Sequence, residues 1–202
     1  MTKVDTVDRI LSAAEDEITQ RGIDGAKLEN IARAAGVTKQ LIYHYFKSKD
    51  HLYSTILETA SRRSPLLADR EVYRDLEPED AIRHMVYTIF SGYIENPSYA
   101  TLTLDQGLHD GEHIGESGSF IVSTRAFIAE VMVPVLERGA ASCVFKPGLD
   151  GDTVFWMVFN LSAACFLNKK IMSETSPIDF DSDQGIAQWR ETTAAFILDA
   201  LR

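Results

Sequence analysis

The sequence predicts an all-α protein, in which a small N-terminal three-helix domain with a helix-turn-helix precedes a larger C-terminal helical domain. Three observations support this fold class. Apolar residues recur every three or four positions along most of the chain, which is the spacing of one helix face. Glycine and proline interrupt this spacing where helices would end or begin. No run alternates apolar and polar residues consistently enough to predict a strand.

The chain is expected to divide near residue 50. Residues 1–50 form the predicted N-terminal domain, with the helix-turn-helix at about 27–46. Residues 51–202 form the predicted C-terminal domain, and a fourth helix over 48–62 links the two. At this length, the chain can bury one small and one larger helical core.

The helix-turn-helix is predicted from two short apolar patterns and the residues between them. Gly36 interrupts the first pattern, because only glycine reaches positive φ without steric cost. Thr38 can cap the following helix through its hydroxyl, and that helix runs to about Tyr45. An earlier helix is expected to begin near Thr6 and to end at Gly22. The inward residues of the two motif helices are Leu28, Ile31, Ala32, Ala35, Ile42 and Phe46.

The outward face of the second motif helix carries a cation, an amide, an apolar group and an aromatic hydroxyl. These residues are Lys39, Gln40, Leu41 and Tyr43, with His44 beside them. A helix lying in the major groove of DNA uses such groups to read base edges and to hold phosphates. The sequence therefore predicts a DNA-binding helix.

Residues 5–60 resemble the DNA-binding domain of the tetracycline-repressor (TetR) family. The resemblance rests on Ile31-Ala32, on Ala35-Gly36-Val37-Thr38 and on the run Ile42-Tyr43-His44-Tyr45-Phe46-Lys47-Ser48-Lys49. The chain departs from the family pattern at Ala26, Lys27, Gln40 and Tyr45, so no operator sequence can be carried over. The resemblance implies DNA contacts from Lys27, Thr38, Lys39, Gln40, Leu41, Tyr43, His44, Tyr45, Lys47 and Lys49.

Several of these residues also have a purely structural explanation. Lys47 and Lys49 could be solvated, Tyr43 could pack beneath the first helix, and Leu41 could fill a minor packing position. DNA contact is favoured for the lysines because phosphate contacts supply much of the affinity for DNA.

The charge of the chain is distributed unevenly. The net charge is −10, yet residues 1–50 contain eight basic and eight acidic residues. The negative charge therefore belongs to residues 51–202, and between Val37 and Lys49 there are three lysines and no acid. This pattern predicts a locally basic DNA-binding surface on an otherwise acidic protein.

The remaining composition indicates a cytoplasmic protein. Cys143 and Cys165 have the spacing of neither a disulfide framework nor a metal motif. The N-terminus lacks the order of a signal peptide. The most apolar segment, 154–167, is shorter than the roughly 20 residues that span a bilayer, so no membrane association is expected.

Helices are also expected through the C-terminal domain. Pro78 is well placed to begin one, after a polar connector over 65–77. A loop with three glycines is predicted over 109–118. A long helix follows over 120–138, with a kink at Pro134.

The last two helices are the predicted dimer interface. Residues 154–159 are apolar on every side of their helix, which requires burial against more than one neighbour. The alternative is that both helices are internal core. TetR-like proteins dimerise through a four-helix bundle formed by this pair, so the resemblance implies a homodimer on a palindromic operator with half-sites about 34–36 Å apart. The expected interface residues are Trp156, Asn160, Trp189, Phe196 and Ile197.

The resemblance further implies a pocket for a small-molecule effector, of apolar or aromatic character, in the C-terminal domain. Candidate lining residues are Tyr87, Phe90, Tyr93, Leu104, Arg125, Phe127, Phe155 and Phe159. The apolar candidates could equally be core, because ligand sites and cores share composition. Arg125 interrupts an apolar stripe, so it would pair with an internal acid, meet an acidic ligand or extend to the surface.

A group of possible metal ligands lies near the predicted glycine loop. Its members are Asp105, His109, Asp110, Glu112 and His113. The two histidines would share a helix face only if the helix continued through Gly111. A solvated acidic loop is therefore expected, with neither a metal nor a cofactor.

These features together predict a DNA-binding transcriptional regulator, acting as a ligand-responsive repressor, and not an enzyme. Two alternatives remain open: an enzyme or small-molecule carrier with an ancillary DNA-binding domain, and a constitutive DNA-binding protein with a solid core. Against the enzyme, the sequence contains no nucleophile elbow, no phosphate-binding glycine loop and no HExxH motif.

Overall fold

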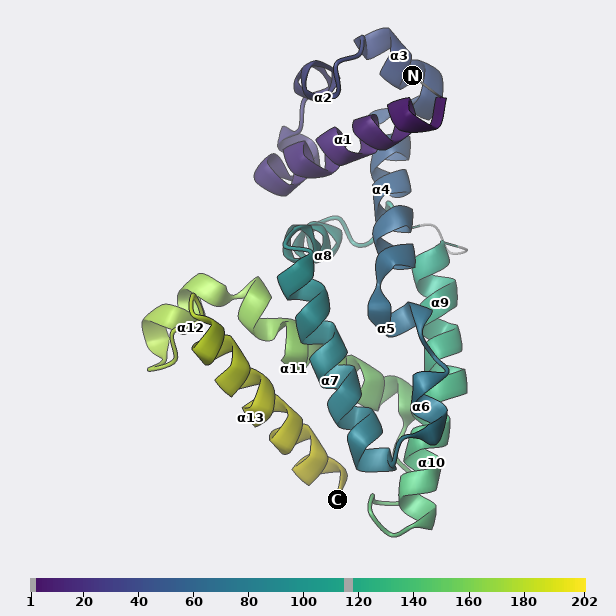
Figure 1. The fold of residues 1–202 in the computed structure, drawn as a ribbon, viewed down its shortest axis with the longest axis vertical. Coiled ribbons are helices and arrows are strands. Elements are labelled where there is room, and N and C mark those ends of the chain that lie inside the picture. Colours follow the sequence, from purple (N-terminus) through teal and green to yellow (C-terminus); the bar gives the residue numbers. More distant parts are fainter. Residues whose placement is uncertain (1–2, 115–117) are drawn as a thin grey trace. The chain divides into compact units, whose positions relative to one another are not determined.

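The computed structural model describes residues 3–114 and 118–202, which are helical and contain no strand (Figure 1). The predicted all-α fold class is therefore confirmed. Contacts group the chain into two compact units. Unit 1 contains Met1–Arg63 and Pro97–Ile121, and unit 2 contains Ser64–Asn96 and Val122–Arg202. This grouping differs from the expected division near residue 50, because a segment from the middle of the chain packs with the N-terminal helices.

Unit 1 contains the predicted helix-turn-helix together with two further helices that pack on it. Its helices are α1 (Lys3–Gly25), α2 (Leu28–Ala35), α3 (Lys39–Phe46), α4 (Lys49–Arg63) and α8 (Ser98–Leu108). One apolar core joins them, formed by Ile10, Ala14, Ile18, Ile31, Ile42, Phe46, Leu52, Tyr53, Ile56 and Leu102, among others. Because α8 contributes Leu102 to this core, residues 97–121 belong physically to the N-terminal unit.

The turn between α2 and α3 has the geometry that the sequence predicts. Gly36 is left-handed, with φ 65° and ψ 38°, and the N–H of Val37 donates to the carbonyl of Ala32 at 2.9 Å. The hydroxyl of Thr38 accepts from the N–H of Leu41 at 3.2 Å, which confirms the predicted cap of α3. These contacts fix the angle at which α3 leaves α2.

Helix α1 changes direction at Gly22 instead of ending there. This residue has φ 67° and ψ 171°, and a further helical turn continues to Gly25. The N–H of Ala26 then donates to the carbonyl of Gly22 at 3.1 Å. The predicted end of the helix is thus a kink that redirects residues 23–27 before α2 begins.

Unit 2 is a second helical unit with its own core. Its helices are α5 (Pro65–Ala68), α6 (Val72–Asp75), α7 (Pro78–Glu95), α9 (Ser119–Phe127), α10 (Val133–Ala141), α11 (Gly151–Leu167), α12 (Lys169–Thr175) and α13 (Asp183–Leu201). Helix α9 belongs to unit 2 from Val122 onwards. Helices α7, α11 and α13 lie side by side (Figure 1). Pro78 occupies the first turn of α7, as predicted. The connector expected over 65–77 is wrong, because this segment forms the short helices α5 and α6.

The irregularity expected at Pro134 is a π-helical turn over Ile128–Met132, between α9 and α10. In this turn the N–H of Val133 donates to the carbonyl of Ile128, five residues earlier. Proline has no N–H and cannot continue the regular helical ladder, so a wider turn just before it accommodates the missing bond.

Two helical stretches of the described chain are strongly apolar, and the predicted segment 154–167 lies in the shorter one, α11. Among the described residues, Ser119–Ala141 is the stretch that is long and apolar enough to cross a membrane, with a mean hydropathy of 1.6 over an 18-residue window. Its buried members, including Phe127 and Met132, face the core of unit 2. A core helix passes the same test of length and composition, so this finding by itself is weak support for a membrane segment.

Candidate functional site

The outer face of α3 presents the polar side chains that the sequence predicts for DNA contact. Gln40, Tyr43 and His44 are exposed, and 45% of Tyr43 is accessible to solvent. On the opposite face, Ile42 and Phe46 are buried in the core of unit 1. Helix α3 therefore has one face anchored and one face free, as a helix that enters a DNA groove requires.

Lys39 is not a free cation in this structure. Its ammonium group forms an ion pair with Glu29 on α2, and this hydrogen bond raises the pKa of Lys39 and lowers that of Glu29. The same ammonium lies 5.9 Å from the centre of the Tyr43 ring. A phosphate or base that meets Lys39 must compete with Glu29, an acid that the sequence interpretation did not consider.

The two lysines after α3 have different environments. Lys47 is exposed and adopts φ 60°, the left-handed region that non-glycine residues rarely occupy. Lys49 donates from its ammonium to the carbonyl of Asp24 at 3.2 Å, so it is tied to the end of α1. Lys49 therefore connects the start of α4 with the segment that follows the kink at Gly22.

The other candidates for DNA contact are placed as follows. Lys27 and Thr38 are exposed, and Leu41 is half-buried. Tyr45 is half-buried and packs against the core of unit 1, so its ring lies on the inner side of α3. Its position on the helix is between the exposed face and the buried pair Ile42 and Phe46, and the DNA contact expected of Tyr45 stays a prediction.

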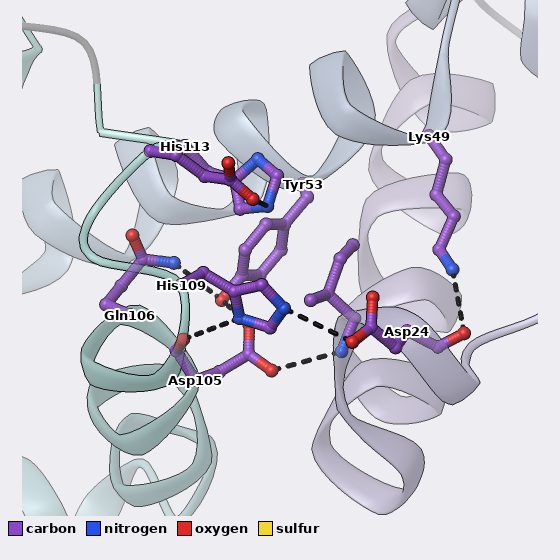
Figure 2. A network of polar contacts seen from close by, with 9 residues as sticks. Asp24, Lys49, Tyr53, Asp105, Gln106, His109 and His113 are labelled. Carbon is purple, nitrogen blue, oxygen red and sulfur yellow. Dashed lines mark hydrogen bonds and ion pairs between the residues drawn. The ribbon is translucent and has the colours of Figure 1, made fainter.

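A buried polar network links α8 to α1 and α4 within unit 1 (Figure 2). Asp105 is buried, with 5% of the residue exposed. One of its oxygens accepts from the N–H of Ile23 at 3.2 Å, and the other accepts from the hydroxyl of Tyr53 at 2.6 Å. Tyr53 in turn accepts from the amide of Gln106 at 2.8 Å. Burial, and then the hydrogen bond to Asp105, raise the pKa of the Tyr53 hydroxyl.

His109 extends this network to the residue that holds Lys49. Its Nδ1 lies 2.8 Å from the carbonyl of Asp105, and its Nε2 lies 3.3 Å from the carboxylate of Asp24. Both partners are acceptors, so both contacts are hydrogen bonds only when both ring nitrogens carry hydrogen, as in the imidazolium. The Asp105 carbonyl, and then the Asp24 carboxylate, raise the pKa of His109.

The raised pKa of His109 predicts a pH-dependent contribution to the stability of unit 1. The contribution is complete below the unfolded value of about 6.5 and is lost as the pH rises through the higher folded value. We therefore expect His109→Gln to lower the thermal midpoint at about pH 6 and to change it less at about pH 9. Asp24→Asn removes the charge of one acceptor and should flatten the same pH dependence.

Thermal unfolding followed by circular dichroism across this pH range measures both variants. The ionisable groups around His109 are Asp24, Asp105 and the pair His113 and Glu112. These groups remain in His109→Gln, so its difference from wild type reports the imidazole itself. A difference between wild type and His109→Gln that does not vary with pH would contradict the expectation.

Residues 109–114, in the described part of the predicted loop, form turns in which Asp110 and Glu112 are exposed, as expected. Asp105 is buried, and the rings of His109 and His113 meet with their centres 5.7 Å apart although α8 ends at Leu108. The ring of His113 also packs edge-on against Tyr53, at 5.0 Å. Within residues 3–114 and 118–202, no group of three or more possible ligands is arranged to hold a metal ion. Of the residues noted as possible ligands, Asp105 and His109 belong to the polar network, and Glu112 pairs with His113.

Five of the residues proposed to line an effector pocket lie inside unit 2. Phe127 packs against Phe155, which stacks on Phe159 at 6.3 Å. Phe90 and Tyr93 both contact the ring of Phe166, and Tyr93 stacks on it at 5.0 Å. These residues therefore form two sets of aromatic contacts in the interior.

The other three pocket candidates do not join these sets. Tyr87 lies on the surface between α7 and α13, where its hydroxyl donates to Glu191 at 2.7 Å and its ring lies beneath Arg190. Leu104 is exposed and belongs to unit 1. Arg125 is exposed, because the buried face of α9 passes through Thr124 and not through Arg125.

The proposed dimer residues also fall into two classes. Trp156 and Phe196 are 42% and 64% exposed, and Asn160 is exposed. Ile197 is buried in unit 2, and Trp189 is half-buried with its ring against Phe180 at 5.6 Å. Ile197 and Trp189 therefore serve the core of their own unit, which differs from the expectation.

Two further apolar side chains on α11 are accessible: Met157, which lies in the apolar run 154–159, and Leu161, which lies beyond it. Met157 is 59% exposed and Leu161 is 36% exposed. The apolar character of α11 continues past residue 159, which is the signal that indicates Leu161.

Both parts of the chain match known families. Residues 10–56 match the bacterial regulatory proteins of the tetR family, and residues 78–197 match the tetracyclin repressor-like C-terminal domain. The second match alone covers more than half of the chain. The chain belongs to the TetR family. The recognition of this family from the helix-turn-helix is thus confirmed, and the protein is a DNA-binding transcriptional regulator.

Relatives of this TetR-family protein support the assignment over its full length. It is 29% identical to the transcriptional repressor NicS of Pseudomonas putida over 201 residues, which covers 98% of this chain and 92% of NicS. It is 42% identical to the regulator RutR of Escherichia coli strain K12 over 79 residues, 38% of this chain and 36% of RutR.

Solved structures show the same fold. A putative transcriptional regulator, SCO4942 of Streptomyces coelicolor, aligns with a TM-score of 0.71 at 20% identity, over 97% of this chain and 98% of that one. The fatty acid degradation regulator FadR of Bacillus halodurans aligns with a TM-score of 0.70 at 18% identity, over 100% and 99% of the two chains. The relatives are regulators from a family that is not enzymatic.

Proposed function

We propose that this TetR-family protein is a cytoplasmic, ligand-responsive repressor that binds a palindromic operator as a homodimer and has no enzymatic activity. The observation that carries the proposal is the outer face of α3. This face presents an amide, an aromatic hydroxyl and an imidazole, Gln40, Tyr43 and His44, on a helix whose other face is anchored in the core. Lysines flank it without an acid in the sequence between Val37 and Lys49.

The side chains suggest distinct contacts with DNA. The amide of Gln40 can bind both N6 and N7 of an adenine, and the methyl groups of Leu41 can contact a thymine methyl. Tyr43 and Lys49 suit phosphates, which fix the position of the helix without reading sequence. Lys39 becomes available when it leaves Glu29.

Substitutions at the proposed phosphate contacts should weaken operator binding. We expect Tyr43→Ala and Lys49→Ala each to raise the Kd by about tenfold, and Lys49→Ala also to lower the salt slope by about 1. The operator would be selected from a random DNA pool with the wild-type protein, and Kd measured by fluorescence anisotropy at several salt concentrations.

Lys170→Ala is the matched control for this experiment. It also removes one positive charge, but from an exposed lysine on α12 in unit 2. If it weakened binding as much as Lys49→Ala, net charge would explain the result and the proposed contact would be wrong. Selection of no preferred sequence by the wild type would contradict operator binding itself.

The homodimer is proposed from an apolar surface on α11 and α13. Trp156, Met157, Leu161 and Phe196 are accessible, and these two helices contact each other. Aromatic and methionine side chains in such a surface are typical of the centre of protein interfaces. Two copies joined there would present two α3 helices to one palindrome.

The effector is proposed to be an aromatic molecule with a hydrogen-bonding group. The hydroxyls of Thr124 and Ser162 are buried without a hydrogen-bond partner. Thr124 precedes Phe127 by one helical turn, and Ser162 follows Phe159 by one turn. A buried hydroxyl beside aromatic rings costs free energy unless it is hydrogen-bonded, and a ligand could supply that bond. The effector must bind the form that releases DNA more tightly than the form that binds it.

One alternative has an observation in its favour. The aromatic rings of unit 2 contact one another, as expected for a constitutive DNA-binding protein with a filled core. An apolar fluorescent dye separates the two possibilities. Saturable dye binding that releases operator DNA supports the effector-responsive repressor, and no dye binding at any concentration supports the constitutive protein.

A further inference from the structure

Helix α8 is attached to α1 by a series of polar contacts spaced one helical turn apart. Ser98 donates to Glu15 at 2.7 Å and Thr101 donates to the carbonyl of Thr19 at 3.3 Å. In the third contact, the carboxylate of Asp105 accepts from the N–H of Ile23 at 3.2 Å. The partners on α1 are four residues apart, so these contacts follow one face of α1 up to its kink.

The same helix is attached to α4. The hydroxyl of Tyr99 donates to the carbonyl of Ala60 at 3.1 Å, and Tyr53 donates to Asp105 at 2.6 Å. Asp105 thus holds α1 with one carboxylate oxygen and α4 with the other (Figure 2). Both bonds go to a buried acceptor, and a buried carboxylate that loses a donor becomes strongly unfavourable.

The residue that meets Asp105 on α1 lies just after the kink. Gly22 has φ 67°, and a Cβ there would lie 3.4 Å from the Asp105 carboxylate. This turn directs the N–H of Ile23 towards α8. The next residue, Asp24, accepts from Lys49 through its carbonyl and contacts His109 through its carboxylate. The segment 23–27 that Asp105 anchors therefore carries both Lys27 and the carbonyl that holds Lys49.

We propose that Asp105 is a positioning residue for DNA recognition, which sets the place of Lys49 by fixing the segment after Gly22 against α4. This inference rests on the proposed phosphate contact of Lys49. Asp105 itself is buried in unit 1 and touches no DNA. Its substitution therefore acts on DNA affinity through the geometry of unit 1.

The sign of the effect distinguishes positioning from charge. Asp105→Asn removes a negative charge from the DNA-binding unit, which alone would strengthen the attraction to DNA. It also leaves the Tyr53 hydroxyl facing an amide instead of a carboxylate. We expect the Kd for the selected operator to rise by about tenfold, because a buried donor loses its charged acceptor. We also expect the salt slope to fall by about 1, as for loss of one phosphate contact.

Asp110→Asn is the matched control. It makes the same change of charge a few residues further along, at an exposed position whose φ of 50° asparagine tolerates. Its Kd should equal or fall slightly below that of wild type. Circular dichroism at the temperature of the titration establishes that each variant is folded, so a loss of stability alone does not raise its measured Kd.

Tyr53→Phe provides a second, milder variant, since it deletes one hydroxyl and keeps the buried ring. It should also raise the Kd, by less than Asp105→Asn does. If Asp105→Asn does not fold, Tyr53→Phe alone tests the positioning role. Because Asp105 acts through Lys49, the double variant Asp105→Asn with Lys49→Ala should bind little worse than Lys49→Ala alone.

The outcomes separate this inference from the proposed function. If Lys49→Ala weakens binding as expected while Asp105→Asn and Tyr53→Phe bind like wild type, the operator contact stands and the positioning role is wrong. Full additivity of Asp105→Asn and Lys49→Ala also overturns it. If Lys49→Ala has no effect on affinity or salt slope, the proposed contact fails, and the positioning role fails with it.

Discussion

Phe196→Asp is expected to dissociate the proposed homodimer into monomers of 22.5 kDa. Phe196 is 64% exposed on α13, and the accessible Trp156 and Met157 lie on the neighbouring α11. In a dimer these side chains would be buried, and a carboxylate placed among them would lose its hydration without a partner. Aromatic residues at the centre of an interface commonly contribute more than about 2 kcal/mol each, so the dimer dissociation constant should rise by a factor of about 30 or more.

Analytical ultracentrifugation over a range of concentrations measures this change. Ile171→Asp is the control, because Ile171 is 67% exposed on α12 and lies outside the proposed interface. The Phe196 variant should also lose affinity for the complete palindrome more than for an isolated half-site. A variant that remains dimeric at the concentrations where wild type does would show that α11 and α13 do not form the interface.

Gly185→Ala is expected to destabilise unit 2, by about 1–3 kcal/mol or more. A Cβ at Gly185 would lie 1.9 Å from the carbonyl oxygen of Asp179. That oxygen belongs to the backbone of the segment preceding α13 and cannot rotate away as a flexible side chain can. The N–H of Gly185 also donates to the hydroxyl of Ser182, the cap of α13, so displacement of the segment would disturb the start of the helix.

Gly107→Ala is expected to have the opposite effect, an increase in the free energy of unfolding. No atom outside its own helix lies within 4 Å of a Cβ built at Gly107 on α8. Replacement of a helical glycine by alanine should stabilise by about 1 kcal/mol. Urea denaturation should therefore shift the midpoints of the two variants in opposite directions. An unchanged midpoint for Gly185→Ala would contradict the close contact with Asp179.

The parts of the structure that follow local rules were predictable from the sequence. The turn at Gly36 and the cap at Thr38 each depend on the chemistry of one residue and a partner within a few positions. Pro78 marks the start of α7 for the same reason. These signals, with the run from Tyr43 to Lys49, were sufficient for the fold class and the family.

The missed features depend on contacts between distant positions. Asp105 meets Ile23 and Tyr53 across 82 and 52 residues, so the sequence showed only an acid near two histidines. Helices α5 and α6 are four residues each, too short for a periodic pattern.

On some helices, the buried face contains other residues than those expected from the sequence. The sequence left three environments open for Arg125, and the exposed one is found, because the buried face of α9 passes through Thr124. Ile197 follows Phe196 directly, and two adjacent helical residues point about 100° apart, so only one of them reaches the outer surface.

The π-helical turn at Ile128–Met132 has a consequence for how this chain can tolerate insertions and deletions. A π turn contains about one residue more than an α turn. The extra residue is accommodated within the wider turn, so the helices before and after it are not rotated relative to each other. The buried faces of α9 and α10 therefore remain aligned across it, through Thr124, Ile128, Met132 and Leu136. Loss of one residue within the turn would keep this alignment, but it would place Pro134 in a regular helical ladder, where its ring clashes with the carbonyl four residues earlier. Loss of one residue elsewhere in α9 or α10 would rotate part of the buried face by about 100° towards solvent.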